Sequence, residues 1–515
     1  MSRRSITGRG VIGPGADQGA DTILVEGGRI VAVGRLSEFE GVEAERSTVD
    51  GWLAPPLVDA HLHPGGLVRR GVELGGVSNR RELVELLAGE AARLPRGVAV
   101  IGHGLDDEQL GGLPTREELD QAVADRPVLV YRRCGHVASA NTAALELAGV
   151  TPDVADPPGG SFDRDPSGRP TGVLREAAVG LVGAALAPLA PGPNPDQVHR
   201  ALAELAGQGV GRVGAMVTVG DGVWCGIGNE LELLVEAAPL PLEVEVFVIT
   251  SDTETLRRAA RRVEATPGLR FGGWKGFADG SLGGWTAALR SPYHDRPDTT
   301  GILGLDPDRA ADLSRLAVEL GGVPAIHAIG DAAVEAVIDL YRDLRADGVE
   351  GAFRIEHASV MDDRLIDQAV ELGLVLSVQP AFALSDSSFL ERRLGPERVE
   401  WAYPLRRMID QGATLVTGSD APVEPPDVLR TLRAAVERCG LSLAEAMAIT
   451  AAHPARTRRT RRPGGRHGRT NTRRVGRRIA DSIYLIFQID QLGFGPWDVQ
   501  ASSNPNPSRS TTTSW

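Results

Sequence analysis

Hydrophobic runs of strand length alternate with stretches of helical periodicity over most of the chain. The runs recur from VAVIGHG (98–104) to ATLVTGSD (413–420). Between the later runs, apolar residues follow helical spacing, as in 310–322 and 362–374. Buried-type strands that alternate with helices indicate a parallel sheet covered by helices. The pattern therefore predicts an α/β fold.

The beginning of the chain has a different pattern. Residues 21–34 read as two short β-branched strands joined at Gly27 and Gly28, which is typical of a hairpin. A further short strand is predicted over 48–53. The first part of the chain therefore predicts a small β-layer that precedes the α/β region.

Polar side chains at the ends of successive strands decide how the parallel sheet closes. They are His61 and His63, Lys275, His327, His357 and Asp420. An open doubly wound sheet would scatter these strand ends, whereas a (β/α)8 barrel gathers them around one mouth. We therefore predict a TIM-like barrel. Because the span from the first to the last of these residues exceeds the roughly 250 residues of a plain barrel, we also predict an insertion over about 67–205.

The same residues are candidate metal ligands. His61 and His63 are two positions apart, so on a strand both imidazoles point to the same face. His327 and His357 each close an apolar strand, and an unpaired carboxylate such as Asp420 is costly there unless it binds a cation or accepts hydrogen bonds. Each histidine taken alone also fits a hydrogen-bonded core residue. Together they form a ligand set that zinc accepts.

Lys275 is the only lysine in the chain, although the chain has 55 basic residues. Arginine stays charged at every working pH, whereas a desolvated lysine can become a neutral, nucleophilic amine. A neutral amine can add carbon dioxide to form a carbamate, which is an anionic ligand able to bridge two cations. The alternative is that Lys275 has no specific role and is the one lysine left by chance in an arginine-rich sequence. We favour the carbamate as the hypothesis.

Six motifs together resemble the amidohydrolase superfamily, specifically amidohydrolase family 3 and its branch similar to N-substituted formamide deformylases. The motifs are DAHLHP (59–64), GHVASANTAAL (135–145), KGFADGSLG (275–283), AIHAIGDAAV (325–334), RIEHAS (354–359) and TGSDAPVEPP (417–426). The resemblance implies a barrel over 55–435, with a small β-sandwich made from 1–54 and the C-terminal part. Residues 436–455 would form a helix that leads back to this sandwich.

The resemblance also implies a mechanism. His61, His63 and Asp420 would hold one divalent ion, expected to be zinc, and His327 and His357 a second where two bind. Carbamylated Lys275 would lie between them. Asp420 would take a proton from the attacking water and return it to the leaving nitrogen. The implied activity is hydrolysis of a non-peptide C–N bond in a small amide, formamide or cyclic amide; an inactive scaffold that keeps the barrel is the alternative.

Three further residues are candidates for substrate binding. His136 matches a family position, and Asp279 and Ser281 follow Lys275 on the same loop. For each, the competing interpretation is a structural turn residue.

Composition predicts the compartment. The chain has an odd number of cysteines, and their spacing is not that of a metal site. This composition fits a reducing cytoplasm. The residues are Cys134, Cys225 and Cys439. The N-terminus has no apolar signal region, and no apolar run reaches about 18 residues. We therefore expect a cytoplasmic protein without a membrane partner, and homo-oligomerisation remains open. A net charge of −13 argues against general nucleic-acid binding.

The C-terminal tail, 456–515, departs from the rest of the chain. Residues 456–478 hold eleven arginines and no acid, and only 479–491 still resembles a strand. Three hypotheses compete: a basic arm that binds nucleic acid, a solvated extension, and a shifted coding frame near Arg456. We favour the shifted frame, because the composition changes abruptly where the family-like motifs stop.

Overall fold

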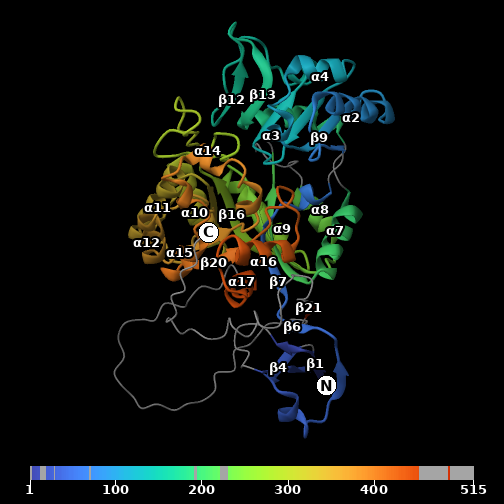
Figure 1. The fold of residues 1–515 in the computed structure, drawn as a ribbon, viewed down its shortest axis with the longest axis vertical. Coiled ribbons are helices and arrows are strands. Elements are labelled where there is room, and N and C mark those ends of the chain that lie inside the picture. Colours follow the sequence, from blue (N-terminus) through green and yellow to red (C-terminus); the bar gives the residue numbers. More distant parts are fainter. Residues whose placement is uncertain are drawn as a thin grey trace, which may run out of the picture.

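Eight parallel strands form one sheet in the centre of the molecule. The computed structural model describes residues 3–11, 19–27, 29–68, 71–190, 194–220, 230–451 and 485–487. The strands of the central sheet are, in spatial order, β7 (Leu57–Leu62), β14 (Val210–Thr218), β15 (Glu243–Ile249), β16 (Leu269–Phe277), β17 (Val323–Ala328), β18 (Arg354–His357), β19 (Val375–Val378) and β20 (Thr414–Thr417) (Figure 1). Their order confirms the predicted TIM-like barrel.

The first and last strands, β7 and β20, meet and close the sheet. Leu62 forms a parallel bridge with Ala421, and the Ala421 carbonyl accepts a hydrogen bond from the His63 amide at 2.8 Å. The Asp59 carboxylate adds a second link, because it accepts from the Ser419 amide at 3.0 Å and from the Ser419 hydroxyl at 2.6 Å. The strands that carry the HxH motif and Asp420 are thereby held side by side.

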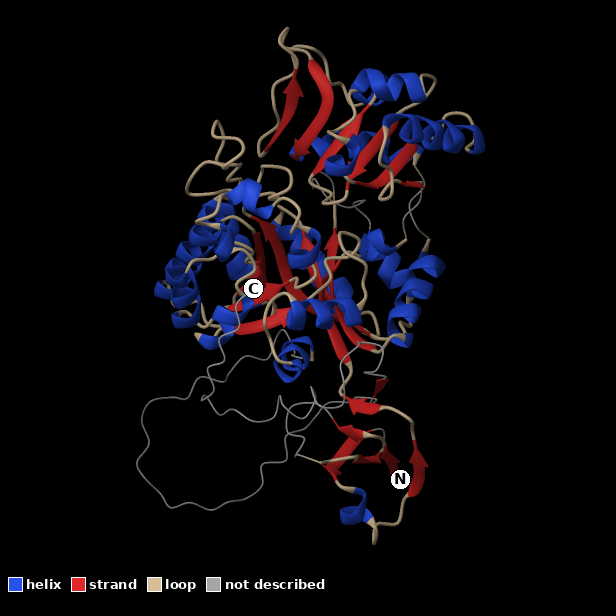
Figure 2. Ribbon diagram, in the orientation of Figure 1, coloured by secondary structure: helices blue, strands red, loops and turns tan. Residues whose placement is uncertain are grey.

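Helices surround the barrel (Figure 2). They are α7 (Pro195–Gly207), α8 (Glu230–Ala237), α9 (Thr253–Glu264), α10 (Pro307–Glu319), α11 (Asp331–Ala346), α12 (Asp363–Glu371), α15 (Leu405–Asp410), α16 (Val428–Glu437) and α17 (Leu443–Thr450). Their apolar faces pack with the outer faces of the strands in one large core. α10 and α12 form where helical spacing predicts helices at 310–322 and 362–374, and α17 lies within the predicted helical segment 436–455.

A separate α/β unit is inserted between β7 and β14, at the carboxyl end of the barrel (Figure 1). Its sheet has the order β12 (Gly160–Arg164), β13 (Pro170–Glu176), β11 (Val137–Ala140), β10 (Val128–Arg132), β9 (Val100–Leu105) and β8 (Val72–Glu73). Its helices include α2 (Arg80–Arg93), α3 (Asp107–Leu110), α4 (Arg116–Ala122), α5 (Thr142–Leu147) and α6 (Ala177–Leu186). The unit has two apolar clusters of its own. The predicted insertion, 67–205, also contains α7, which packs on α8 and β14 of the barrel.

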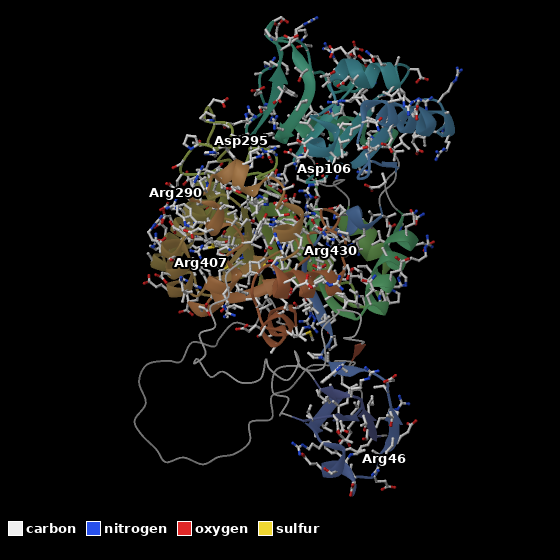
Figure 3. All side chains as sticks on the ribbon, in the orientation of Figure 1. Arg46, Asp106, Arg290, Asp295, Arg407 and Arg430 are labelled. Atoms are coloured by element: carbon white, nitrogen blue, oxygen red, sulfur yellow. The ribbon has the colours of Figure 1, made fainter. Side chains whose placement is uncertain are left out.

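Charged residues fix the inserted unit to the barrel. Arg393, on α14 (Leu390–Leu394), is 1% exposed and donates to Glu108 of the inserted unit at 3.0 Å. The same guanidinium pairs with Asp295 of the barrel and lies 3.6 Å above the Trp285 ring. Figure 3 labels Asp295 on the part of the barrel that faces the inserted unit. Arg393 is therefore a buried cation shared by both parts.

The N-terminal residues form two small sheets. One contains β1 (Arg3–Thr7), β3 (Thr22–Glu26), β4 (Arg29–Gly34) and β5 (Glu45–Thr48), and the other contains β2 (Gly10–Val11), β6 (Trp52–Ala54) and β21 (Leu485–Phe487). The antiparallel pairing of β3 with β4 confirms the predicted hairpin. The single strand predicted over 48–53 is wrong: β5 ends at Thr48 and β6 starts at Trp52, because the chain bends at Asp50 and Gly51 to change sheets.

The C-terminal tail is described only at β21, which pairs antiparallel with β6 and falls within the strand-like segment 479–491. The arginine-rich segment 456–478 lies outside the described residues, so its three hypotheses stay predictions. Among the helices of the described part, none combines the length and apolar character needed to cross a membrane.

We predict that Arg393→Ala lowers the free energy of unfolding by about 3 kcal/mol, because it leaves two carboxylates at the junction without their buried partner. The matched control is Arg392→Ala. Arg392 contacts the same Glu108 and Asp295 but is 48% exposed, so its loss should cost less than about 1 kcal/mol. Denaturant unfolding of both variants measures the difference, and equal losses would contradict a special role for the buried arginine.

Candidate metal centre

The six residues predicted as ligands lie together at the carboxyl ends of the barrel strands. His61 is in β7, Lys275 in β16 and His327 in β17, while His357 ends β18. Asp420 follows β20. The exposed fraction is 0% for His61, 1% for Lys275 and 7% for Asp420. Five of the six side chains are thus withdrawn from water at one end of the barrel, and the His63 side chain is 20% exposed.

His61, His63 and Asp420 form the tightest cluster. Their candidate ligand atoms all lie within 4.8 Å of one another. Asp420 Oδ1 is 3.1 Å from His61 Nε2 and 3.3 Å from His63 Nε2. Burial alone would raise the pKa of Asp420, but the charge of His61 and the close approach of both imidazoles hold it well below its usual value. This carboxylate is therefore an anion that faces two imidazoles.

His327, His357 and Lys275 complete the group. The His357 ring centroid is 4.9 Å from that of His61 and 4.4 Å from that of His327. Lys275 Nζ lies 4.8 Å from the centre of the Phe277 ring. Burial lowers the pKa of His327 and His357, and the positive charge of Lys275 lowers both further. The lysine is therefore close enough to act electrostatically on both histidines.

One nitrogen of each central histidine is used for orientation. His61 Nδ1 is 2.6 Å from Glu356 Oε2, His357 Nδ1 is 2.8 Å from Gln379 Oε1, and His327 Nε2 is 2.9 Å from the Gly280 carbonyl oxygen. Such contacts fix the ring and leave the other nitrogen for a metal ion.

His61 Nε2 tests this interpretation. Among the described residues it is a buried atom without a hydrogen-bond partner, although it lies 3.1 Å from the Asp420 carboxylate. A buried polar atom in this state is costly. A cation held by both groups would satisfy it, so the residues present fit a divalent metal ion.

Sequence reasoning missed Glu356 and Gln379. Glu356 is 0% exposed and lies between Arg354 and His61. Burial would raise the pKa of Glu356, but the charges of Arg354 and His61 hold it well below its usual value. The available signal was two charged residues at alternate positions in the apolar strand RIEH, which places both on one face. Gln379 gave no comparable signal.

Backbone strain concentrates at the same place. His357 has a φ of 72° and Asp420 a φ of 56°, and neither is glycine. Left-handed conformations are uncommon for such residues and persist where the surrounding structure holds them. Strain of this kind clusters at functional sites, which agrees with the position of these two residues at the centre.

His136 reaches this centre from the inserted unit. Its Nδ1 is 2.8 Å from Glu176 Oε2, and its ring centroid is 5.1 Å from that of His327. Burial lowers the pKa of His136, but the Glu176 carboxylate outweighs this effect and the pKa rises to about 9. The structure therefore places His136 beside the predicted ligands, and its role in substrate binding stays a prediction.

The Asp279 carboxylate is engaged with the backbone. It accepts hydrogen bonds from the amides of Ala288 at 2.9 Å, Ile329 at 2.9 Å and Gly330 at 2.8 Å. Burial raises its pKa to about 7 in spite of these bonds. Asp279 Oδ1 also lies 3.3 Å from His327 Nε2. Asp279 thus ties two mouth loops together beside a candidate metal ligand, and its role in substrate binding stays a prediction.

Ser281 lines a cavity beside the centre. Its hydroxyl donates to Cys134 Sγ at 3.6 Å and accepts from the Gly284 amide at 3.3 Å. The cavity is bounded by the inserted unit on one side and by barrel loops on the other. Its lining includes Arg132, Arg133, Cys134, Ser281, Ile329, Phe382, Asp386, Tyr403 and Glu424. Of the three candidates for substrate binding, Ser281 is the one that borders this space directly.

Comparisons with known proteins agree with this geometry. A putative amidohydrolase, YtcJ, of Bacillus subtilis (strain 168) is 31% identical over 436 residues, which cover 81% of this chain and 80% of that protein. The N-substituted formamide deformylase of Arthrobacter pascens is 28% identical over 461 residues, covering 84% and 83%. The crystal structure of an uncharacterized metal-dependent hydrolase from Pyrococcus furiosus matches with a TM-score of 0.64 at 30% identity, covering 87% of this chain and 93% of that one.

A family model described as the amidohydrolase family matches residues 50–464, which include the whole barrel and the inserted unit. Since the match spans most of the chain, and the relatives cover it to a similar extent, the chain belongs to the amidohydrolase family.

Proposed function

We propose that this chain hydrolyses a non-peptide carbon–nitrogen bond in a small amide, formamide or cyclic amide. The observation that carries the proposal is the group of buried donors at the barrel mouth, in which Asp420 Oδ1 faces His61 Nε2 and His63 Nε2. A relative of similar length is named as an N-substituted formamide deformylase, which supports this class of substrate.

The residues suit one or two divalent ions, with zinc as the expected metal. His61, His63 and Asp420 would hold one ion, and His327 and His357 the other. A metal held there would lower the pKa of a coordinated water and polarise the carbonyl that is attacked. Orientation of the rings by Glu356, Gln379 and the Gly280 carbonyl supports both assignments.

Lys275 supplies the bridging ligand in this proposal. Its neutral amine would attack carbon dioxide, so that the N–C bond forms as one C–O π bond opens, and the proton from the nitrogen would pass to water and leave an anionic carbamate. The surroundings favour this reaction, because the side chain is 1% exposed and lies among histidines. Burial disfavours the charged ammonium form of a lysine. Arginine cannot take this role, since its guanidinium remains protonated.

Asp420 serves as the proton carrier. Its carboxylate accepts a proton from the attacking water and returns it to the leaving nitrogen, which would otherwise depart as a poor leaving group. The anionic state of this carboxylate is supported by the two imidazoles that face it. The position of Asp420 directly after β20 keeps it fixed at the barrel mouth.

We predict that the metal-reconstituted protein hydrolyses at least one member of a panel of N-formyl amines, N-acyl amines and cyclic amides. Product release is followed by detection of the free amine, with and without a chelator. Activity that persists after complete metal removal would contradict a metal-dependent mechanism, and a panel without any turnover would contradict the proposed substrate class.

We predict that Lys275→Arg lowers kcat/KM by more than about 100-fold, since arginine keeps the charge but forms no carbamate. The matched control is Arg270→Lys, on the same strand but 62% exposed, which should leave activity unchanged. Metal content measured on the same samples distinguishes a lost bridging ligand from a misfolded protein. Full activity of Lys275→Arg would exclude the bridging role.

We predict that Gln379→Met weakens metal binding by about 10-fold, because His357 loses the acceptor that orients its ring. Methionine has a similar length, so the packing of the site should change little. Titration against a chromogenic chelator measures the affinity. Gln109→Met, at an exposed position of the inserted unit, is the control, and equal affinities of both variants would contradict the orienting role of Gln379.

A further inference from the structure

Glu176 has a backbone conformation that normally belongs to glycine. Its φ is 51° and its ψ is −120°, values close to the first central position of a type II′ turn. A side chain at such a position costs free energy, and such strain persists where the surrounding structure enforces it and a function uses it. Glu176 lies at the end of β13, where the inserted unit approaches the barrel.

The Glu176 carboxylate is also buried and only partly satisfied. The residue is 4% exposed, and its Oε2 is 2.8 Å from His136 Nδ1. Its backbone amide donates to the His136 carbonyl at 2.8 Å, so the two residues are joined twice. Oε1 is a buried atom without a hydrogen-bond partner among the described residues. Burying a carboxylate oxygen without a partner costs free energy, and packing alone gives no reason to retain it.

The metal-site loop is shaped around this carboxylate. A Cβ added at Gly280 would lie 2.0 Å from Glu176 Oε1, so the close approach requires glycine at that position. The Gly280 carbonyl in turn orients His327, whose Nε2 is 2.9 Å away. Glu176, from the inserted unit, is therefore separated from a candidate metal ligand by a single residue of the barrel.

A cavity lies beside both the His136 loop and the candidate metal centre. It is lined by Cys134, two positions before His136, and by Ser281, which follows Gly280. It is also lined by Phe382, whose ring is stacked on the His357 ring with centroids 6.2 Å apart. The cavity therefore lies beside the His136 loop and beside a ring that packs on His357, while His136 itself faces His327.

We propose that the inserted unit completes the active centre: Glu176 is a positioning residue that fixes His136, and His136 contacts the polar amide group of the substrate at the candidate metal centre, where its ring centroid is 5.1 Å from that of His327. The inference rests on the proposed hydrolysis of a small amide and extends it to a second structural unit. Glu176 acts through His136 and is not itself a metal ligand.

Substitution by glycine separates positioning from folding. Glu176→Gly relieves the backbone strain but also removes the buried partner of His136, so its Tm is measured beside that of Glu176→Gln, and we expect both variants to stay folded at the assay temperature. Its kcat/KM on the amide that the wild-type protein hydrolyses fastest should fall about 100-fold, the size expected when a contact to the reacting group is displaced by about 1 Å. Glu176→Gln, which keeps an acceptor for Nδ1, should restore part of this loss. Glu146→Ala, at an exposed position of the same unit, is the control.

A double-mutant cycle tests whether Glu176 acts through His136. If it does, the kcat/KM of His136→Ala combined with Glu176→Gly equals that of His136→Ala alone, because the second change has nothing left to position. Losses that multiply in the double variant would overturn the proposal. Wild-type activity of Glu176→Gly would overturn it as well.

Two measurements do not depend on turnover. Cobalt reconstitution should give the same metal stoichiometry and visible spectrum for Glu176→Gly and the wild-type protein, and a lost equivalent of cobalt would show that Glu176 is a ligand and overturn the proposal. A downfield proton resonance from His136 Nδ1–H should disappear in Glu176→Gly and persist in Glu146→Ala; its persistence in Glu176→Gly would overturn the pairing. Since both readouts work without substrate, failure of the amide panel alone would count against the proposed hydrolysis and not against this pair.

Discussion

The parallel contact between β7 and β20 is the constraint on which the rest of the site depends. These strands are the first and last of the barrel, and each carries part of the tightest donor cluster, His61 and His63 on one side and Asp420 on the other. The bridge from Leu62 to Ala421 and the two hydrogen bonds from Ser419 to Asp59 hold them together. Closure of the barrel and assembly of the cluster are therefore the same event, and a change that opens this seam would remove both.

Burial then gives the cluster its chemistry. Side chains withdrawn from water need partners, and each central histidine finds one for a single ring nitrogen, in Glu356, Gln379 or the Gly280 carbonyl. The other nitrogen is left for a further partner, as a metal site requires, and for His61 this is Nε2, which lies 3.1 Å from Asp420 Oδ1. The inserted unit adds His136 and its partner Glu176 to the same space. The strand ends of the barrel thus supply the donors of the centre, and the inserted unit supplies two residues that lie beside them.

Prediction from sequence succeeded where a physical requirement acts on neighbouring residues. Strand ends, the HxH spacing and the single lysine are local signals, and the structure brings all six predicted residues together. It was less successful where the partner lies far away in the chain. Glu356 meets His61 across 295 positions, and Glu176 meets His136 across 40. The three backbone partners of Asp279 likewise come from two other loops.

The sequence by itself determined that buried parallel strands would carry metal-type donors at their ends, because side-chain periodicity and the cost of burying unpaired polar groups operate within a few residues. Only the tertiary structure decided which ring nitrogen each histidine presents and which acid holds His136. It alone also shows that Gly280 must lack a side chain for Glu176 to approach. These features depend on the spacing between segments that come together only when the barrel closes and the inserted unit packs against it, and no local pattern encodes that spacing.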